Sequence, residues 1–243
     1  MALSKAFTVG VCTCSGYCAY SEHVPARSSD HAGPSHQTGR IVAWGDLTPQ
    51  PWRNGGGVTR EILSRRRSNS GAWVPAGDDW DWRLSIADVD RAGAFSSFPG
   101  MTRTLTVIEG ATVTLTIGGV TKELEKHRPF TFDGGASTSA EIPHGPIRDL
   151  NLIVRTGVVN AEVSVTTLSA GQSLRASDGQ YCVLLDGQAA VMADALTAGS
   201  ADLALNPFDT VLGSATPPTT ISGEGTLAII TVATAGSGAP EML

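Results

Sequence analysis

A glycine-rich segment beside an arginine is the first part of this sequence that could carry out chemistry. Residues 51–62 read PWRNGGGVTREI, and three consecutive glycines allow a backbone with positive φ or a close approach to another group. No helical pattern and no Lys-Ser/Thr pair follow, so a phosphate-binding P-loop is excluded. The glycines either form only a tight turn into a strand or place Arg60, at the start of that strand, beside a ligand. An arginine on the inner face of a small barrel needs a carboxylate partner, from the protein or from a ligand.

Other arginines occur in segments that are otherwise apolar or rich in threonine. Arg103 and Arg155 are of this kind, and either can be a surface residue, although Arg103 can equally face a cavity. The run Arg65–Arg67 belongs to residues 64–81, which contain several Gly and Asp residues and are expected to form a loop. This run is interpreted as a solvated charged face rather than a binding patch.

Metal catalysis is the main alternative chemistry, and the histidine positions argue against it in the body of the chain. Metal sites in such barrels use two or three clustered imidazoles with carboxylates. His127 and His144 lie in separate predicted turns, without H-x-H or H-x₃₋₅-H spacing. We therefore expect no metal and no other cofactor there. Near the N-terminus, Cys12, Cys14 and Cys18 could hold a metal with a nearby histidine, or could belong to a poorly ordered extension.

Nucleophilic catalysis has no signal in the sequence. No G-x-S-x-G motif occurs. The cysteine spacing does not make a disulfide framework, and Cys182, within the apolar run QYCVLL, is expected to be a buried core thiol. No residue is therefore assigned a catalytic role, and a binding protein is favoured over an enzyme.

Alternating apolar and polar residues predict that strands position these side chains. In residues 82–87, every second residue from Trp82 points one way and every second residue from Arg83 points the other. Residues 102–108 and 111–117 also alternate, and Glu109-Gly110 between them predicts a hairpin. Further strands are expected at 130–132, 150–155, 161–168, 181–185, 189–193, 208–212 and 227–233. Short strands repeating every 8–12 residues or so, with few or no helices, predict an all-β sandwich or barrel.

The composition limits the number of domains and the class of partner. A chain of 243 residues with 41% apolar and 16% charged residues can bury the core of one barrel or of two fused barrels. A net charge of −6 offers no basic excess for a phosphate backbone, so nucleic acid is not an expected partner. No apolar run reaches the ~20 residues of a membrane span, and residues 1–20 lack signal-peptide features, which favours the cytoplasm. Residues 1–39 are expected to be a flexible N-terminal extension.

Four motifs are similar to the HutD/Ves family. They read PWRNGGGVTREIL, WDWRLSIADV, GAFSSFPGMTRTLTVIEG and PIRDLNLIVR, and they lie in the family's order within about residues 41–156. The resemblance implies a bicupin, with an N-terminal cupin barrel at 40–156 and a C-terminal cupin-like barrel at 157–243. The second half carries no motif that can be matched residue by residue.

The resemblance also implies a function and a site. It links the chain to histidine utilisation, which the family is thought to modulate by sensing a pathway intermediate. Arg60 is the expected pocket arginine, and Asn54, Ser85 and Arg103 are further candidate ligand-binding residues. The expected ligand is a small carboxylate such as urocanate or N-formylglutamate, because a buried arginine forms charge-assisted bidentate bonds with carboxylates.

Two other functions remain open from the sequence. A cupin-fold isomerase or lyase acting on a small carboxylic acid would need an acid–base group near Arg60, and Glu61, Glu109 and His144 are the candidates. A protein-interaction module would instead use exposed strand edges. Turnover of a candidate acid would favour the enzyme, and a co-purifying partner would favour the interaction module.

Overall fold

Strands make up nearly all the regular structure of the residues that the structure describes. The computed structural model describes residues 40–193 and 201–236, so the predicted flexible extension and its three cysteines lie outside the described residues. The described residues contain a 3₁₀ turn, η1 (Trp44–Asp46), and no α-helix, which confirms the all-β prediction. None of their helical segments is long and apolar enough to cross a bilayer.

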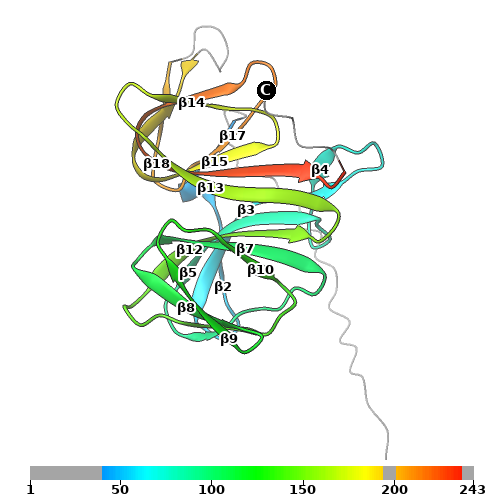
Figure 1. The fold of residues 1–243 in the computed structure, drawn as a ribbon. Helices are drawn as coiled ribbons and strands as arrows, with labels where there is room; N and C mark the ends of the chain where they lie inside the picture. The colour runs from blue at the N-terminus through cyan, green and yellow to red at the C-terminus, as the bar shows by residue number, and fades with distance from the viewer. Residues whose placement is uncertain (1–39, 194–200, 237–243) are drawn as a thin grey trace, which may run out of the picture. The chain divides into compact units, whose positions relative to one another are not determined.

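The strands form three antiparallel sheets, which Figure 1 shows. The N-sheet has the order β10-β7-β12-β5-β3-β2 with β4 added to β3, the side sheet has the order β6-β11-β8-β9, and the C-sheet has the order β1-β17-β15-β18-β13 with β14 and β16 added. The strand bounds are β1 (Ile41–Val42), β2 (Pro49–Pro51), β3 (Gly57–Arg67), β4 (Trp73–Pro75), β5 (Trp82–Val89), β6 (Gly93–Ala94), β7 (Met101–Glu109), β8 (Thr112–Ile117), β9 (Val120–Glu125), β10 (Phe130–Asp133), β11 (Thr138–Glu141), β12 (Ile147–Arg155), β13 (Val159–Leu168), β14 (Ser173–Ala176), β15 (Gln180–Val191), β16 (Leu203–Leu205), β17 (Thr210–Leu212) and β18 (Thr219–Thr234).

The N-sheet is covered on both faces, because its strands alternate in the way the sequence predicts. On the face that we call the interface face, Leu84 and Leu152 pack with Val183 and Ile230 of the C-sheet in one apolar cluster. On the opposite face, the cavity face, a second cluster joins residues of β5, β7 and β12 to residues of β8, β9 and β11 in the side sheet. The N-sheet is therefore the central layer of this part of the molecule.

A third apolar cluster is formed mainly by residues of the C-sheet strands. It includes Leu184, Val211 and Ile221 and also Cys182, which has no exposed surface. Burial raises the pKa of the Cys182 thiol to about 12. The prediction that Cys182 is a buried core thiol is therefore confirmed.

The two predicted barrels are not confirmed as closed barrels. The paired strand orders are open at both ends in all three sheets, as far as the described residues show. In addition, β1 pairs with β17 through Ile41↔Val211 and Val42↔Thr210, so these two residues join the C-sheet rather than the strands that follow them. Val42 is buried in the cluster between the two large sheets, which explains this placement.

Two local predictions are corrected by the strand pairing. The segments around Glu109-Gly110 do not form a hairpin, because β7 belongs to the N-sheet and β8 to the side sheet. Gly110, at φ 88°, turns the chain between sheets where a Cβ would lie 2.9 Å from the Pro146 carbonyl oxygen. The run Arg65–Arg67 is also strand rather than loop, since these residues extend β3 and pair with β4.

Candidate functional site

A cavity of about 410 Å³ opens on the cavity face of the N-sheet. Strands β3, β5, β7 and β12 supply its floor, and the segments before β3 and after β6 supply its walls. Its lining residues are Gln50, Pro51, Trp52, Arg53, Asn54, Thr59, Arg83, Ser85, Ala87, Ala94, Phe95, Ser96, Phe98, Arg103, Asn151 and Ile153. The lining contains three arginines and no Asp, Glu or His, so the cavity is suited to an anion.

The strand register places two of these arginines in one row. Ile153 on β12 pairs with Arg83 on β5 and with Arg103 on β7, so the two arginines flank it on adjacent strands. The next row along contains Ser85 and Asn151, which are also cross-strand partners. The antiparallel register therefore brings together polar residues that lie far apart in the sequence.

Arg103 is a nearly buried cation that has no carboxylate within ion-pair distance among the described residues. Its exposed fraction is 7%, and its Nε donates to Asn151 Oδ1 at 2.7 Å, an oxygen that also accepts from Nη2. Its Cζ lies 4.7 Å from the centre of the Phe95 ring. Burial lowers the pKa of Arg103 to about 10, and the nearby Asp149 opposes this shift. Nη1 has no hydrogen bond within the described chain, so it is available to a molecule in the cavity.

Arg83 is held in a similar way. Its Cζ lies 5.0 Å from the centre of the Trp80 ring and 5.5 Å from that of Phe98. Its Nε is buried and has no hydrogen-bond partner in the described structure. Burial lowers the pKa of Arg83, and Glu61 opposes this effect. Two guanidinium groups thus stand over aromatic rings, which attract cations but leave the in-plane N–H donors free.

A buried polar chain continues behind Arg103. Asn151 Nδ2 donates to Asp149 Oδ1, and Asp149 has no exposed surface. Burial raises the pKa of Asp149 to about 7, while Arg103 and the hydrogen bond from Asn151 oppose the rise. The carboxyl group does not line the cavity, and Asn151, which does, connects it to Arg103.

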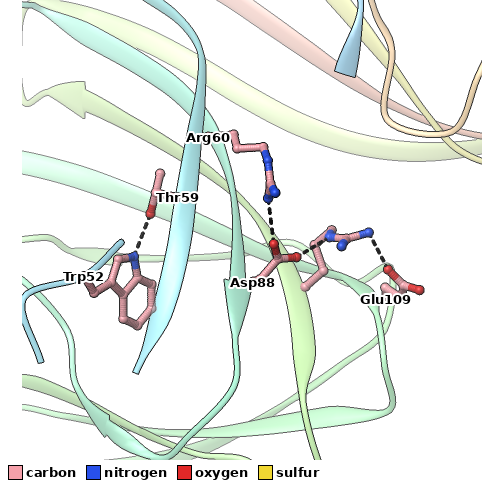
Figure 2. Close-up of polar contacts among 6 residues, drawn as sticks. Trp52, Thr59, Arg60, Asp88 and Glu109 are labelled. Carbon is pink, nitrogen blue, oxygen red and sulfur yellow. Dashed lines mark hydrogen bonds and ion pairs between the residues drawn. The ribbon is translucent and has the colours of Figure 1, made fainter. Parts of the chain in front are cut away.

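The glycine-rich segment shapes one wall of the cavity. Gly57 must lack a side chain, because a Cβ there would lie 2.2 Å from the Asp88 carbonyl oxygen. Asn54 Oδ1 accepts the backbone N–H of Gly56 at 2.9 Å, which fixes the turn. Trp52 Nε1 donates to Thr59 Oγ1 at 2.8 Å, which holds the indole against the cavity (Figure 2). The glycines therefore serve a tight turn that presents the wall, rather than a site that cradles a phosphate.

Arg60 lies on the other face of the sheet, away from the cavity. In Figure 2, Thr59 and Arg60 point to opposite sides of their strand. Arg60 Nη1 lies 2.7 Å from Asp88 Oδ2, and Arg148 Nε lies 2.6 Å from Asp88 Oδ1. The identification of Arg60 as the pocket arginine is thus not supported by the geometry, because strand alternation turns its side chain toward the interface face. There it finds a carboxylate of the protein.

Among the other candidates, Asn54, Ser85 and Arg103 do line the cavity, and their binding role remains a prediction. Sequence reasoning missed Arg83. The sequence could have indicated Arg83, because Arg83 and Ser85 lie on the same face of the predicted strand at 82–87. If Ser85 is predicted to line a pocket, Arg83 is expected to line it as well. Arg155 lies outside the cavity and pairs with Asp81 at 2.7 Å.

The acid–base candidates do not converge on the cavity. Glu61, Glu109 and His144 are absent from its lining, and Glu109 is bound by Arg148 at 2.6 Å. The described residues also contain no group of three or more His, Cys, Asp or Glu side chains that could hold a metal ion. The chemistry that the lining supports is recognition of an anion by arginines in a partly apolar cavity.

Curated relatives match about half of this chain. Protein Ves of Citrobacter koseri is 40% identical over 116 residues, which are 47% of this chain and 56% of that protein. An uncharacterized 21.2 kDa protein in the hutC 3′ region of Pseudomonas putida is 40% identical over 109 residues, which are 44% of this chain and 54% of that protein. The chain thus spans a little more than half the length of these two relatives.

Solved structures match a larger part of the chain. HutD from Pseudomonas fluorescens SBW25, in a formate condition, has a TM-score of 0.61 and 28% identity over 81% of this chain and 98% of that one. A cupin 2 conserved barrel domain protein from Leptotrichia buccalis has a TM-score of 0.52 at 10% identity, over 82% of this chain and 99% of that one, which shows a cupin-like fold alone. The family model HutD matches residues 45–230, well over half of the sequence. The chain belongs to the HutD family.

Proposed function

We propose that this protein binds a small carboxylate in the N-sheet cavity and thereby modulates histidine utilisation. The observation that carries the proposal is Arg103, a cation with 7% exposure that has no carboxylate of the described chain within ion-pair distance. A buried charge needs a partner, and an anionic ligand would supply one. Arg83 in the same row offers a second set of donors, so one carboxylate can bridge the two guanidinium groups.

The lining also supports a ligand class. Trp52, Phe95 and Phe98 give the cavity aromatic walls, while Ser85 and Asn54 add polar groups at its floor and rim. A volume of about 410 Å³ is within the range of small-molecule sites. Urocanate and N-formylglutamate are the proposed ligands, since both are small carboxylates and the family is associated with the histidine utilisation locus.

The proposal includes a two-module organisation of the chain. The N-terminal half has its own core between the N-sheet and the side sheet, and the C-terminal half has its own core within the C-sheet. The apolar cluster on the interface face of the N-sheet joins the two halves. Separate cores with an apolar interface between them support two cupin-type modules, of which the first carries the proposed site.

The test compares two arginines from opposite faces of the same sheet. Binding of N-formylglutamate and urocanate is measured by titration calorimetry on the parent, Arg103→Gln and Arg60→Gln. We expect Arg103→Gln to weaken binding about 10- to 100-fold, because a hydrogen bond to a charged group contributes about 1.5–3 kcal/mol. Arg60→Gln should bind as the parent does. Parent-like binding by Arg103→Gln, or loss of binding in Arg60→Gln alone, would place the site elsewhere.

A further inference from the structure

Asp149, on β12, is a buried carboxyl group that lies behind the cavity lining. It has no exposed surface, and its Oδ2 atom has no hydrogen-bond partner among the described residues. Buried polar atoms are nearly always paired, and an unpaired carboxyl oxygen destabilises the folded state. Its other oxygen, Oδ1, accepts the buried Asn151 amide, so Asp149 makes that hydrogen bond while its Oδ2 stays unpaired.

Asp149 is connected to the cavity through one residue. A guanidinium group can only donate hydrogen bonds, so the Asn151 oxygen must face Arg103 and the Asn151 amide NH₂ must face Asp149. Arg103 thus fixes which way the amide points, Asp149 accepts the NH₂ group, and Asn151 holds the Arg103 guanidinium through Nε and Nη2. The remaining nitrogen, Nη1, is the one left open to a molecule in the cavity.

The ionisation state of Asp149 changes the electrostatic environment of Arg103. Arg103 on β7 is the cation that favours the ionised carboxylate, and Asp88 on β5 is the anion that opposes it. Asp88 is itself shared between Arg60 and Arg148, so it is already neutralised. Burial raises the pKa of Asp149 to about 7, so both forms are present near neutral pH. Arg103 is balanced by a negative charge when Asp149 is ionised, and it is unbalanced when Asp149 is protonated.

We propose that Asp149, acting through Asn151 and Arg103, is a positioning residue whose protonation state sets how tightly the cavity holds an anion. This proposal rests on the anion-binding function and adds its regulation by pH. The ionised carboxylate competes with the ligand for the positive field of Arg103, and protonation removes that competitor while leaving the amide in place. Anion binding and proton uptake by Asp149 are therefore linked, and each favours the other.

The experiment measures anion affinity against pH on the full chain. The probes are N-formyl-L-glutamate and acetate, whose carboxylates stay ionised from about pH 5.5 to about pH 8.5. For the parent, Kd should rise about tenfold from about pH 6 to about pH 8, the order of size expected for one nearby unit charge in a partly desolvated site. Calorimetry in buffers of different ionisation enthalpy should show uptake of a fraction of a proton near pH 7.

The decisive variant is Asp149→Asn, a neutral side chain of the same shape. It should bind with the low-pH affinity of the parent at every pH and take up no proton on binding. Glu109→Gln is the matched control, because it also converts a carboxylate to an amide on this sheet, at an exposed position paired with Arg148. The Kd of this control should depend on pH as the Kd of the parent does. Both variants keep all the histidines of the parent, so a difference between the two variants cannot come from histidine titration.

The outcomes separate the two proposals. If the parent binds neither probe at any pH, the anion-binding function itself is lost, and its regulation is lost with it. If the parent binds but its Kd does not change with pH, or if Asp149→Asn keeps the parent's slope, the role of Asp149 is overturned while the binding function stands. If Asp149→Asn does not fold, Asp149→Ser and the parent's proton uptake take its place, and zero uptake by the parent overturns the role.

Discussion

The arginines on the two faces of the N-sheet have different interaction partners. On the interface face, Arg60 and Arg148 share the Asp88 carboxylate at 2.7 and 2.6 Å, and Arg148 also binds Glu109. On the cavity face, Arg83 and Arg103 stand over aromatic rings with no such ion pair in the described part of the chain. The interface-face arginines pair with carboxylates of the protein, whereas the cavity-face arginines have no carboxylate within ion-pair distance among the described residues.

The comparison of the two faces shows how an arginine with a structural role can be distinguished from a candidate binding residue. A buried or half-buried cation has to be compensated, and compensation by the protein removes it from ligand recognition. The Trp44 ring adds to the internal compensation, since it lies 4.7 Å from Arg60 Cζ and 5.2 Å from Arg148 Cζ. In this sheet the arginine next to the glycine-rich turn pairs with a carboxylate of the protein, and the two arginines that line the cavity floor have none within ion-pair distance among the described residues.

The largest expected effect is a loss of stability when an apolar side chain on the interface face is shortened, and it is compared with a substitution on the cavity face. Leu152→Ala should lower the free energy of unfolding by about 3 kcal/mol, because Leu152 is 1% exposed in the cluster between the two large sheets. Anion affinity should stay close to that of the parent. Ser85→Ala, on the cavity face, should change stability by about 0.5 kcal/mol or less but weaken binding. Denaturant unfolding and calorimetry check both, and equal effects of the two variants on binding would remove the distinction between the faces.

A smaller effect is expected from removing the shared carboxylate of the interface face. Asp88→Asn should destabilise the protein by about 2 kcal/mol, since the amide removes the negative charge that two half-buried arginines share and replaces one of the two acceptor oxygens with a donor. Glu109→Gln serves as the comparison and should cost about 0.5 kcal/mol or less, because the Glu109 side chain is 59% exposed. Thermal and urea unfolding measure both. Similar costs for the two variants would show that Asp88 does not hold the arginine pair.

The smallest expected effect is the pH dependence of stability that comes from the cavity face. The folded-state pKa of Asp149 is raised to about 7 from an ordinary value of 3.8, so its stabilising contribution is complete below about pH 4 and is lost as pH rises through 7. Between about pH 6 and about pH 8 the free energy of unfolding should fall by about 1 kcal/mol. Asp149→Asn should remove this slope in urea unfolding curves, and an unchanged slope would assign it to other groups.

Much of the fold could be predicted because strand alternation is local. The predicted strand at 82–87 lies within β5, and the cross-strand partners of Arg83 and Ser85 are on the face that the sequence assigned to them. The predicted hairpin at Glu109-Gly110 was wrong for a reason that is not local, since the same turn residues can return a chain along its own sheet or carry it to another. The glycine-rich segment places Trp52, Arg53 and Asn54 along one wall of the cavity, and its role in binding stays a prediction.

The sequence by itself determined the all-β class, the family and the division of each strand into two faces, because these depend on residue order and on a side-chain period of two. Only the tertiary structure decided which face encloses the cavity and which arginines line it. Arg60 finds its carboxylate 28 residues away, and Arg103 finds an amide 48 residues away. Such partners are brought together by register and sheet packing, so the compensation of a charge, and with it the location of the site, cannot be derived from neighbours along the chain.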